Sequence, residues 1–583
     1  MKAPQWIGLL VGGLCLYLLV RGIADRAEEL VPPGSYVAAV LMQVASLCVA
    51  AAVTVAGCTV LGGDRALTWL LSLLPVVERV VLPYAVTSAM TRPGQPAPGL
   101  AGVVDALQLS MCLAGVGAAR WAHAAVSGRV RRSGAAQDAP APERGLERPP
   151  ERRAASPWAW FLAASICGAA VMAWNGSKVS LPKPPPPQAL PRPNGFDDVR
   201  AAAALVRDRA ALASESKRLH LLIAANPITA PLPTPSAETK ALLAANAPAL
   251  ARLEPFLTRD YVEPRPSRGA DRASYGPIRD LARLLSLRAM AKAGEGRGRT
   301  AMDSGLEAVA LGLRVPRGAG VSGALWGGAL QSIGREPLWS MVDHLAAEDC
   351  RADALRLLRL NRGTVPLWES VQEEKWDVRE RLRDQMNRAQ DGAPVKPVKS
   401  DLVPLSADVR PWMARRMLSE AIQAYSDELD VTTEWARRPY AQRGELPEPS
   451  VSLSPASMTA AILSPVSGEL STPLTKDQVL NDLLAVTLAL RAYRLERGAY
   501  PERLAQLVPR YLDAVPQDPF ARSGDLRYRR SGSGYVLYSV GPDTRDDGGR
   551  PIDKPLTAQG KPRTRYTVLE DSKGDIVAGV NWR

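Results

Sequence analysis

The stretch Tyr36–Gly63, YVAAVLMQVASLCVAAAVTVAGCTVLGG, decides how the rest of the chain is interpreted. It runs for 28 residues without a charged side chain, whereas about 20 apolar residues in a helix suffice to cross the hydrocarbon core of a bilayer. Two further stretches, Trp6–Val20 and Trp158–Trp174, are also uncharged, and the second has a tryptophan at each end, as is typical of membrane interfaces. The sequence therefore predicts a multi-pass membrane protein in contact with lipid.

Two other apolar segments are interrupted by acidic residues. Leu67–Val86 contains Glu78, and Leu100–Ala119 contains Asp105. A charge at the centre of a bilayer costs about 2.5–3.5 kcal/mol on insertion scales. Either these acids lie near helix ends or on surface helices, or they form a polar pathway through the bundle. The first interpretation is favoured, because a transporter normally needs more than five spans, and three to five spans are expected here.

The distribution of arginine predicts the orientation in the membrane. Residues 120–156 contain eight arginines and four acidic residues, and loops rich in Lys and Arg stay in the cytoplasm. The N-terminus would then be cytoplasmic, and residues 175–583 would lie outside the cytoplasm, in the bacterial periplasm. The first apolar stretch, followed by Ala24, also fits a signal peptide loosely. The long second stretch favours a multi-pass anchor in the inner membrane.

Beyond the membrane the pattern becomes helical. Proline-rich Leu181–Pro193 favours an extended spacer, and apolar residues three and four apart then predict helices over Ile278–Leu287 and Met302–Val315, with a later helix broken near Pro337. The stretch 284–316 resembles a tetratricopeptide-like helical pair. The predicted segments are 1–126 with two to four transmembrane spans, 127–156 as a basic cytoplasmic loop, 157–175 as the last span, 176–195 as a linker, 196–445 as an α-helical bundle or solenoid, 446–475 as a second linker, and 476–583 as a small α+β module.

The C-terminal module contains an ordered series of motifs. A helix stops at Gly498-Ala-Tyr-Pro501, Asp518-Pro-Phe520 follows in a loop, strand-like runs flank Ser531–Gly534, and Tyr538-Ser-Val-Gly-Pro-Asp543 leads into an acidic, glycine-rich loop. In this order the module resembles the globular head of the type II secretion major pseudopilin, the G-type subunit. Phe520 stands where that family has tryptophan, and the family's leader and long apolar helix do not precede residue 479. The chain therefore resembles a pseudopilin head fused to a membrane-tethered, mainly α-helical protein.

This resemblance implies a calcium site, because in that family the acidic loop binds calcium. Calcium takes several oxygen ligands at about 2.3–2.6 Å. Asp543 lies at the matching position, and Asp546 and Asp547 supply further carboxylates on the same loop. The alternative is a solvated acidic turn, because Arg545 and Arg550 would partly neutralise a site.

The remaining composition argues against several function classes. The chain has 583 residues and a net charge of +13, but the basic residues alternate with acidic ones, as in Asp377–Asp384, so we expect solvated helix faces and no nucleic-acid partner. The sequence contains no phosphate-binding loop, zinc-protease motif, paired cysteine motif or nucleophile elbow. His344 follows Asp343, but adjacent helix positions point about 100° apart and form no dyad. No catalytic or cofactor-binding residue is predicted.

Three functions follow as hypotheses. The leading one is a non-enzymatic bacterial inner-membrane protein whose periplasmic part binds other envelope proteins; the resemblance implies a type II secretion or pilus-like assembly. An alternative is a hydrolase of envelope polymers that uses carboxylates of the helical domain, which predicts a deep acidic cleft between residues 196 and 442. A third is a membrane sensor or transporter component in which Asp105 and Glu78 face one another.

Overall fold

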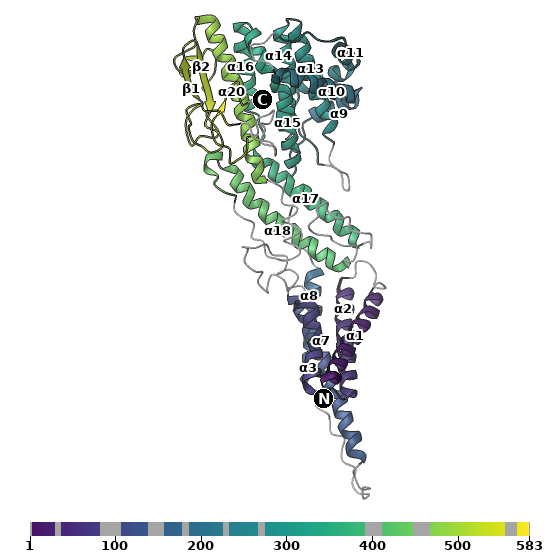
Figure 1. Ribbon diagram of the computed structural model, residues 1–583. Helices are drawn as coiled ribbons and strands as arrows, with labels where there is room; N and C mark the ends of the chain where they lie inside the picture. Colours follow the sequence, from purple (N-terminus) through teal and green to yellow (C-terminus); the bar gives the residue numbers. More distant parts are fainter. Residues whose placement is uncertain are drawn as a thin grey trace. The chain divides into compact units, whose positions relative to one another are not determined.

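The chain forms two compact units (Figure 1). The first unit comprises Met1–Lys183, Arg381–Tyr425 and Pro449–Leu463, and the second comprises Pro184–Glu380, Ser426–Glu448 and Ser464–Arg583. The computed structural model describes residues 3–28, 36–81, 106–137, 157–177, 183, 186–225, 232–265, 274–390, 411–446, 467–553 and 568–581. In these residues the fold is mainly helical with one small sheet, as the sequence predicts.

The first unit is a set of packed helices that contain the uncharged stretches. α2 packs on α1, α7 and α8, and α7 also packs on α8. Two helical segments, Gln5–Ile23 and Val40–Val60, are long and apolar enough to cross a membrane, and Pro157–Val171 is a shorter apolar helix. The helices are α1 (Ala3–Glu28), α2 (Tyr36–Val60), α3 (Arg65–Ser72), α4 (Leu74–Val76), the π-helical Val77–Val81, α7 (Ala106–Gln137) and α8 (Pro157–Ser177).

The two apolar segments that contain acidic residues form different structures. Leu67–Val86 is not a single long helix in its described part, because α3 stops at Ser72 and two short helical pieces follow. The described part of Leu100–Ala119 belongs to α7, which continues to Gln137 inside the predicted basic loop. Asp105 lies outside the described residues.

The second unit is built from short helices packed around one long one. The division between the units falls within α17 (Leu367–Gln390) and α18 (Pro411–Arg437). The other helices are α9 (Gly195–Ala204), α10 (Arg209–Ala225), α11 (Ala237–Ala245), α12 (Ala247–Leu253), α13 (Gly276–Gly294), α14 (Gly298–Arg314), α15 (Gly320–Met341), α16 (Ala347–Asn361) and α20 (Ser467–Arg497), with short 3-10 turns at Glu254–Thr258, Val342–His344, Tyr440–Gln442 and Leu504–Leu507.

The predicted break near Pro337 is wrong, because α15 continues through this residue to Met341. A proline inside a helix removes one main-chain hydrogen bond. Here tertiary packing offsets that loss, because the following Leu338 and Trp339 are buried and Leu338 lies beside Gly305 of α14. The local signal for a helix break is therefore overridden by the core.

α14 and α15 pack with their backbones in contact. A methyl group on Gly312 would lie 2.5 Å from the Gln331 nitrogen and 2.6 Å from the Gly327 oxygen, and one on Gly334 would lie 2.8 Å from the Val309 nitrogen. Such approaches leave no room for any side chain. Glycine at these positions therefore sets the distance between the two helices.

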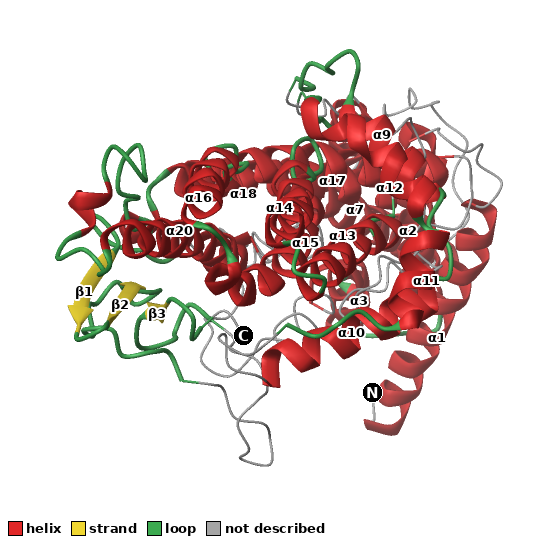
Figure 2. Ribbon diagram, turned by 90° about the horizontal axis from the view of Figure 1, so that it is seen from above, coloured by secondary structure: helices red, strands yellow, loops and turns green. Residues whose placement is uncertain are grey.

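The C-terminal sheet confirms the predicted hairpin. Antiparallel strands β1 (Arg527–Ser531) and β2 (Gly534–Ser539) pair with Ser531 opposite Gly534, and β3 (Ile576–Val577) pairs antiparallel with β2. The helix stop predicted at Gly498 is also confirmed, because α20 ends at Arg497 and Gly498 has a φ of +80°, which favours glycine. The strands lie beside α20 (Figure 2).

The regions predicted as a helical domain (196–445) and as an α+β module (476–583) share one hydrophobic core, which extends from Phe196 to Ile576. α20 joins them, because it packs against α15, α16 and β2. Its apolar residues are buried on several sides of the helix, as expected of a central helix; they include Leu480, Leu483, Leu484, Val486, Leu488 and Leu490.

We expect Gly312→Ala to destabilise the second unit by about 1–3 kcal/mol, because the added methyl group forces α14 away from α15. The measurement is the urea midpoint of the full-length chain in detergent, together with hydrogen exchange of the α14 and α15 amides. Gly534→Ala is the matched control, because a methyl group there has no neighbour closer than 3.7 Å. Equal midpoints for the two variants would contradict the close contact.

Candidate functional site

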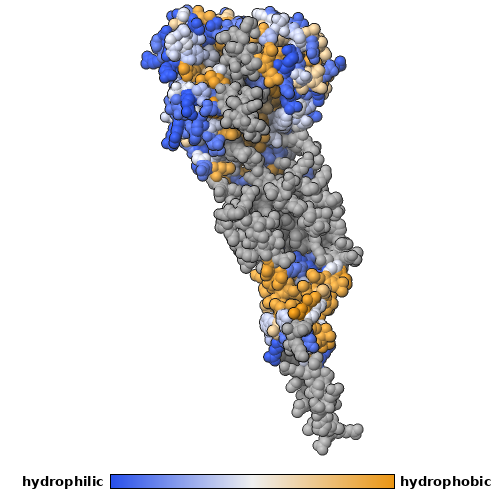
Figure 3. Space-filling model, viewed as in Figure 1, coloured by the Kyte–Doolittle hydropathy of each residue, from blue (hydrophilic) through white to orange (hydrophobic). Residues whose placement is uncertain are grey.

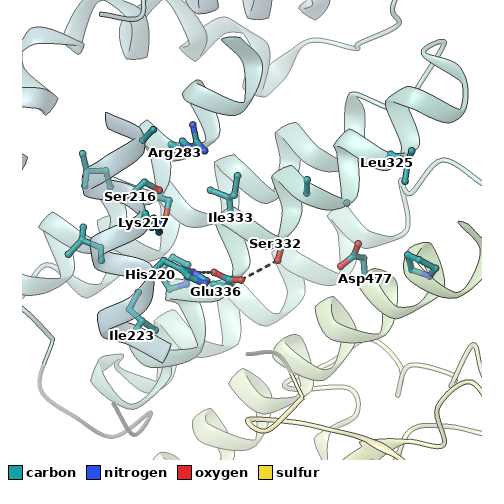
Figure 4. Close-up of a pocket in the computed structure, with 18 of the residues that line it drawn as sticks. Ser216, Lys217, His220, Ile223, Arg283, Leu325, Ser332, Ile333, Glu336 and Asp477 are labelled. Carbon is teal, nitrogen blue, oxygen red and sulfur yellow. Dashed lines mark hydrogen bonds and ion pairs between the residues drawn. The ribbon is translucent and has the colours of Figure 1, made fainter. Parts of the chain in front are cut away.

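A pocket of about 850 Å³ lies between α10, α13, α15 and α20, all within the second unit (Figure 4). On α15 the lining recurs every four residues at Leu325, Ala329, Ile333 and Pro337. The lined part of α15 is about 20 Å long at 1.5 Å per residue. The pocket therefore follows a helix face, and we call it the trough.

α10 forms one wall of the trough and is fixed in place by Glu215. This buried carboxylate accepts hydrogen bonds from Arg218 Nε at 2.7 Å and from the Thr239 hydroxyl of α11. The Arg218 hydrogen bond is the main reason that the pKa of Glu215 is lowered to about 2. Ser236 caps α11 by accepting from the Thr239 amide at 3.1 Å, so the start of α11 and the middle of α10 are held together.

An imidazole and a carboxylate meet inside the trough. His220 Nδ1 of α10 contacts a carboxylate oxygen of Glu336 on α15, and Ser332 Oγ lies 3.4 Å from the other oxygen (Figure 4). The carboxylate thus stands between the hydroxyl and the imidazole. A serine nucleophile needs the imidazole next to its hydroxyl, so this arrangement favours binding over nucleophilic catalysis.

The charges of the trough are mainly basic. Lys217, Arg283 and Lys476 line it together with the acids Glu336 and Asp477. Glu336 pairs with His220, Asp477 pairs with both Arg335 and Lys476, and Arg283 pairs with Asp280. The hydrolase hypothesis expects a deep acidic cleft in this region, and the trough does not have that character. It can instead attract a negatively charged partner.

A buried polar network supports the α20 wall of the trough. Arg335 of α15 donates to Asp477 Oδ1 at 2.7 Å and to Asn481 Oδ1 at 2.9 Å, and Asn481 Nδ2 donates to Gln331 Oε1 at 2.9 Å. Arg335 is only 3% exposed. A guanidinium buried to this degree has to be paired, so these contacts hold α15 and α20 in one register.

The network continues from the trough toward the sheet. Asn361 at the end of α16 donates to Asp482 Oδ1 at 2.7 Å, and burial raises the pKa of Asp482 to about 7, with the negative charge of Asp518 adding to the rise. Asp518 in turn accepts from Ser539 Oγ at 2.7 Å and from the Val540 amide at 2.8 Å. Asn361 thus joins α16 to α20, and Asp518 joins the loop before β1 to the end of β2.

The three predicted calcium ligands lie on the loop after β2. Asp546 accepts hydrogen bonds from the Tyr538 hydroxyl at 2.9 Å and from the Gly548 amide at 3.0 Å, and it pairs with Arg527 Nε at 3.3 Å. Asp543 Oδ1 accepts from the Arg545 amide at 3.2 Å. The Asp547 amide donates to Asp575, a buried residue that the sequence did not single out.

In the part of the chain that the structure describes, no group of three or more His, Cys, Asp or Glu side chains is placed to hold a metal ion. Asp543, Asp546 and Asp547 are therefore not brought together as such a group. Asp546 is held instead by an arginine and a tyrosine. Calcium binding stays a prediction of the resemblance.

The sequence alone did not identify the paired polar residues in and beside the trough. His220 lies far from Glu336 in the sequence, and Arg335 lies 142 positions from Asp477. The helical spacing of Lys217, His220 and Ile223 is a local sign of a common helix face, but it does not identify what that face contacts.

The sequence matches no family model and no curated protein, and the structure matches no solved structure.

We expect Asp482→Asn to reduce the pH dependence of stability. The folded chain keeps this carboxyl protonated up to about pH 7, whereas the unfolded chain releases the proton near pH 4. The folded state binds more protons between these values, so the free energy of unfolding falls as the pH rises from about 4 to 7. The asparagine variant should be more stable than wild type at pH 8, by about 2–4 kcal/mol.

The test compares urea midpoints of the full-length chain at pH 5 and pH 8. Part of the slope should remain in the variant, because burial also raises the pKa of Asp353 to about 7. Asp571→Asn, at an exposed position, serves as the control. If Asp482→Asn shows the same difference between the two pH values as wild type, the assignment is wrong.

For calcium, calorimetric titration of the full-length chain in detergent should show uptake that Asp543→Ala abolishes. Arg527→Gln should tighten binding, because it removes the cation paired with Asp546. Arg362→Gln removes an equal charge from an exposed pair with Asp513 and should have no effect. An intact chain that produces no heat on calcium addition would end this prediction.

Proposed function

We propose that the chain is a non-enzymatic protein of the bacterial inner membrane whose second unit lies in the periplasm and binds other envelope proteins. The apolar helices α1, α2 and α8 of the first unit would be embedded in lipid. The resemblance of the C-terminal module to a pseudopilin head suggests that the assembly is of the type II secretion or pilus-like kind.

The outward faces of the first unit carry this proposal. α1 exposes a series of large apolar side chains, and α2 adds others, including Val49 and Val53. Exposed apolar patches of this size are rare on proteins in water. Figure 3 displays hydrophobic residues gathered on the surface of this unit, whereas the visible surface of the second unit is largely hydrophilic. The exposed residues of α1 are Ile7, Val11, Leu14, Leu18, Leu19 and Ile23.

One set of polar groups in the first unit is turned inward. Arg21 is 6% exposed and its Nη2 lies 3.0 Å from Glu78 Oε1, and the Tyr17 hydroxyl donates to the same carboxylate at 2.7 Å. Arg79 donates to Gln43 at 2.6 Å. Charged groups in lipid face the interior of a bundle and pair there, so this apolar-out, polar-in pattern supports a membrane location.

The same pairing gives Glu78 a structural role. Its carboxylate neutralises Arg21 and links α1 to the π-helical segment. The sensor or transporter hypothesis needs Glu78 and Asp105 to face one another, and Asp105 lies outside the described residues. The observed partner of Glu78 favours an anchor over a transport pathway.

The binding role depends on the second unit. Its trough offers a basic, partly apolar surface without an arranged nucleophile. It follows α15 for about 20 Å, a length that suits a segment of another protein. Recognition of another envelope protein is therefore the function that this geometry supports best.

Fusions of alkaline phosphatase, which is active only outside the cytoplasm, test the orientation. We expect inactivity after residues 64 and 140 and activity after residue 180. A fusion after residue 95 distinguishes five spans, which predict activity, from three, which predict none. Reciprocal fusions of β-galactosidase are the control. Inactive phosphatase after residue 180 would overturn the periplasmic assignment.

A further inference from the structure

We infer that the trough is the docking site for an amphipathic helix of a partner protein, with an apolar stripe at its centre and acidic residues along its flanks. This inference rests on the proposed binding function of the second unit and specifies the surface and the kind of segment that it recognises.

The shape of the trough suits a helix. α15 forms the floor through residues spaced four apart, and α10 and α20 contribute faces with spacings of three and four. On α20 the lining residues are Leu470, Pro473, Leu474, Lys476 and Asp477, and the lined length of α15 corresponds to about 13 residues of a docked helix. Docking of an amphipathic helix into a groove of this kind is a recurring mode of peptide recognition.

The floor of the trough has small residues in the middle and larger apolar residues toward both ends. Gly328 and Ala329 lie at the centre of the α15 face, with Leu325 toward one end and Ile333 toward the other. Leu325 is 53% exposed and Ala329 is also exposed, whereas Gly328 is buried and the Asp477 carboxylate occupies the space beside it. A leucine or isoleucine of a docked helix would cover Leu325 and lie over Ala329.

The charges of the walls select acidic flanks on the partner. Lys217 on α10 is exposed, and within the described residues it has no ion pair. Arg283 on α13 and Lys476 on α20 lie on other sides of the same pocket. Arg283 already pairs with Asp280 at 3.0 Å, and Glu336 pairs with His220. Asp477 lies 2.7 Å from Arg335 and 3.9 Å from Lys476, so its single negative charge does not balance both cations. The charge left for a ligand to balance is therefore positive.

The arrangement of the labelled side chains agrees with this assignment. In Figure 4, Ser216, Lys217, His220 and Ile223 extend from α10 toward the α15 face that carries Ser332, Ile333 and Glu336, while Asp477 lies on α20 across the floor. Hydroxyl groups and apolar side chains alternate along the walls. Such walls can contact both the polar flanks and the apolar stripe of one helix.

The test uses a fluorescein-labelled peptide of about 18 residues, ~27 Å as a helix, with leucine at every third and fourth position and glutamate along both flanks. Fluorescence anisotropy is measured with the full-length chain in detergent, and empty micelles of the same detergent give the background. The acidic peptide should bind, and a peptide with lysine in place of every glutamate should not. Equal binding of both peptides would overturn the inference.

Two variants of the chain locate the binding. Lys217→Glu should weaken the acidic peptide by about tenfold, with a smaller loss at high salt. Lys240→Glu makes the same charge change on α11, outside the trough, and should leave the affinity unchanged. Ala329→Trp should abolish binding by filling the floor. Because Lys217 is exposed, its variant should fold normally, and identical affinities for Lys217→Glu and Lys240→Glu would reject the site.

Other occupants give different results. If light scattering shows a dimer of the full-length chain that Ala329→Trp converts to a monomer, the trough binds a second copy and the inference of a separate partner is wrong. The peptide assay does not depend on which side of the membrane the second unit occupies. Loss of peptide binding together with the expected phosphatase pattern would reject the docking site alone.

Discussion

The buried guanidinium of Arg335 is the constraint on which the second unit depends. It comes from α15, and it must find partners without water, which it does in Asp477 and Asn481 of α20. Removing one member of such a pair leaves an uncompensated buried charge, which is far more costly than losing an exposed ion pair. The long helix α20 is therefore held against α15 at one register, and its two halves are positioned with it.

Those two halves have different tasks. Residues near Leu470 and Asp477 form a wall of the trough, whereas the apolar residues that follow pack against α16 and the sheet. The C-terminal module is consequently not an appendage with a core of its own. Asp518, from the loop before β1, accepts a hydrogen bond from the end of β2. Its negative charge also contributes to the raised pKa of Asp482 on α20. The trough and the sheet are thus parts of one packed structure.

The sequence predicts the features that arise from neighbouring residues. The helices around Ile278 and Met302 follow from apolar spacing, and the β1–β2 hairpin follows from strand-like runs around Ser531–Gly534. Features that arise from residues distant in the sequence cannot be predicted in this way, because the spacing of residues along a helix does not indicate which other element its face contacts. Glu336 finds His220 only through the packing of α15 on α10, and the core carries α15 past Pro337. Likewise, the sequence of the acidic loop indicates three carboxylates that could bind a cation. It does not indicate that the fold places Arg527 against Asp546.

Arginine–carboxylate pairing does more in this chain than join helices. In the first unit, Arg21 and Glu78 cancel each other's charge inside an apolar bundle, and large apolar side chains are exposed on α1 between Ile7 and Ile23. In the second unit, Arg335 removes the charge of Asp477 from a wall of the trough. Lys476 lies 3.9 Å from the same carboxylate, so two cations share one negative charge. Positive charge therefore remains at this wall, in addition to that of Lys217 on α10, and it can attract acidic groups. The contact that fixes α20 therefore also gives the trough its preference in charge.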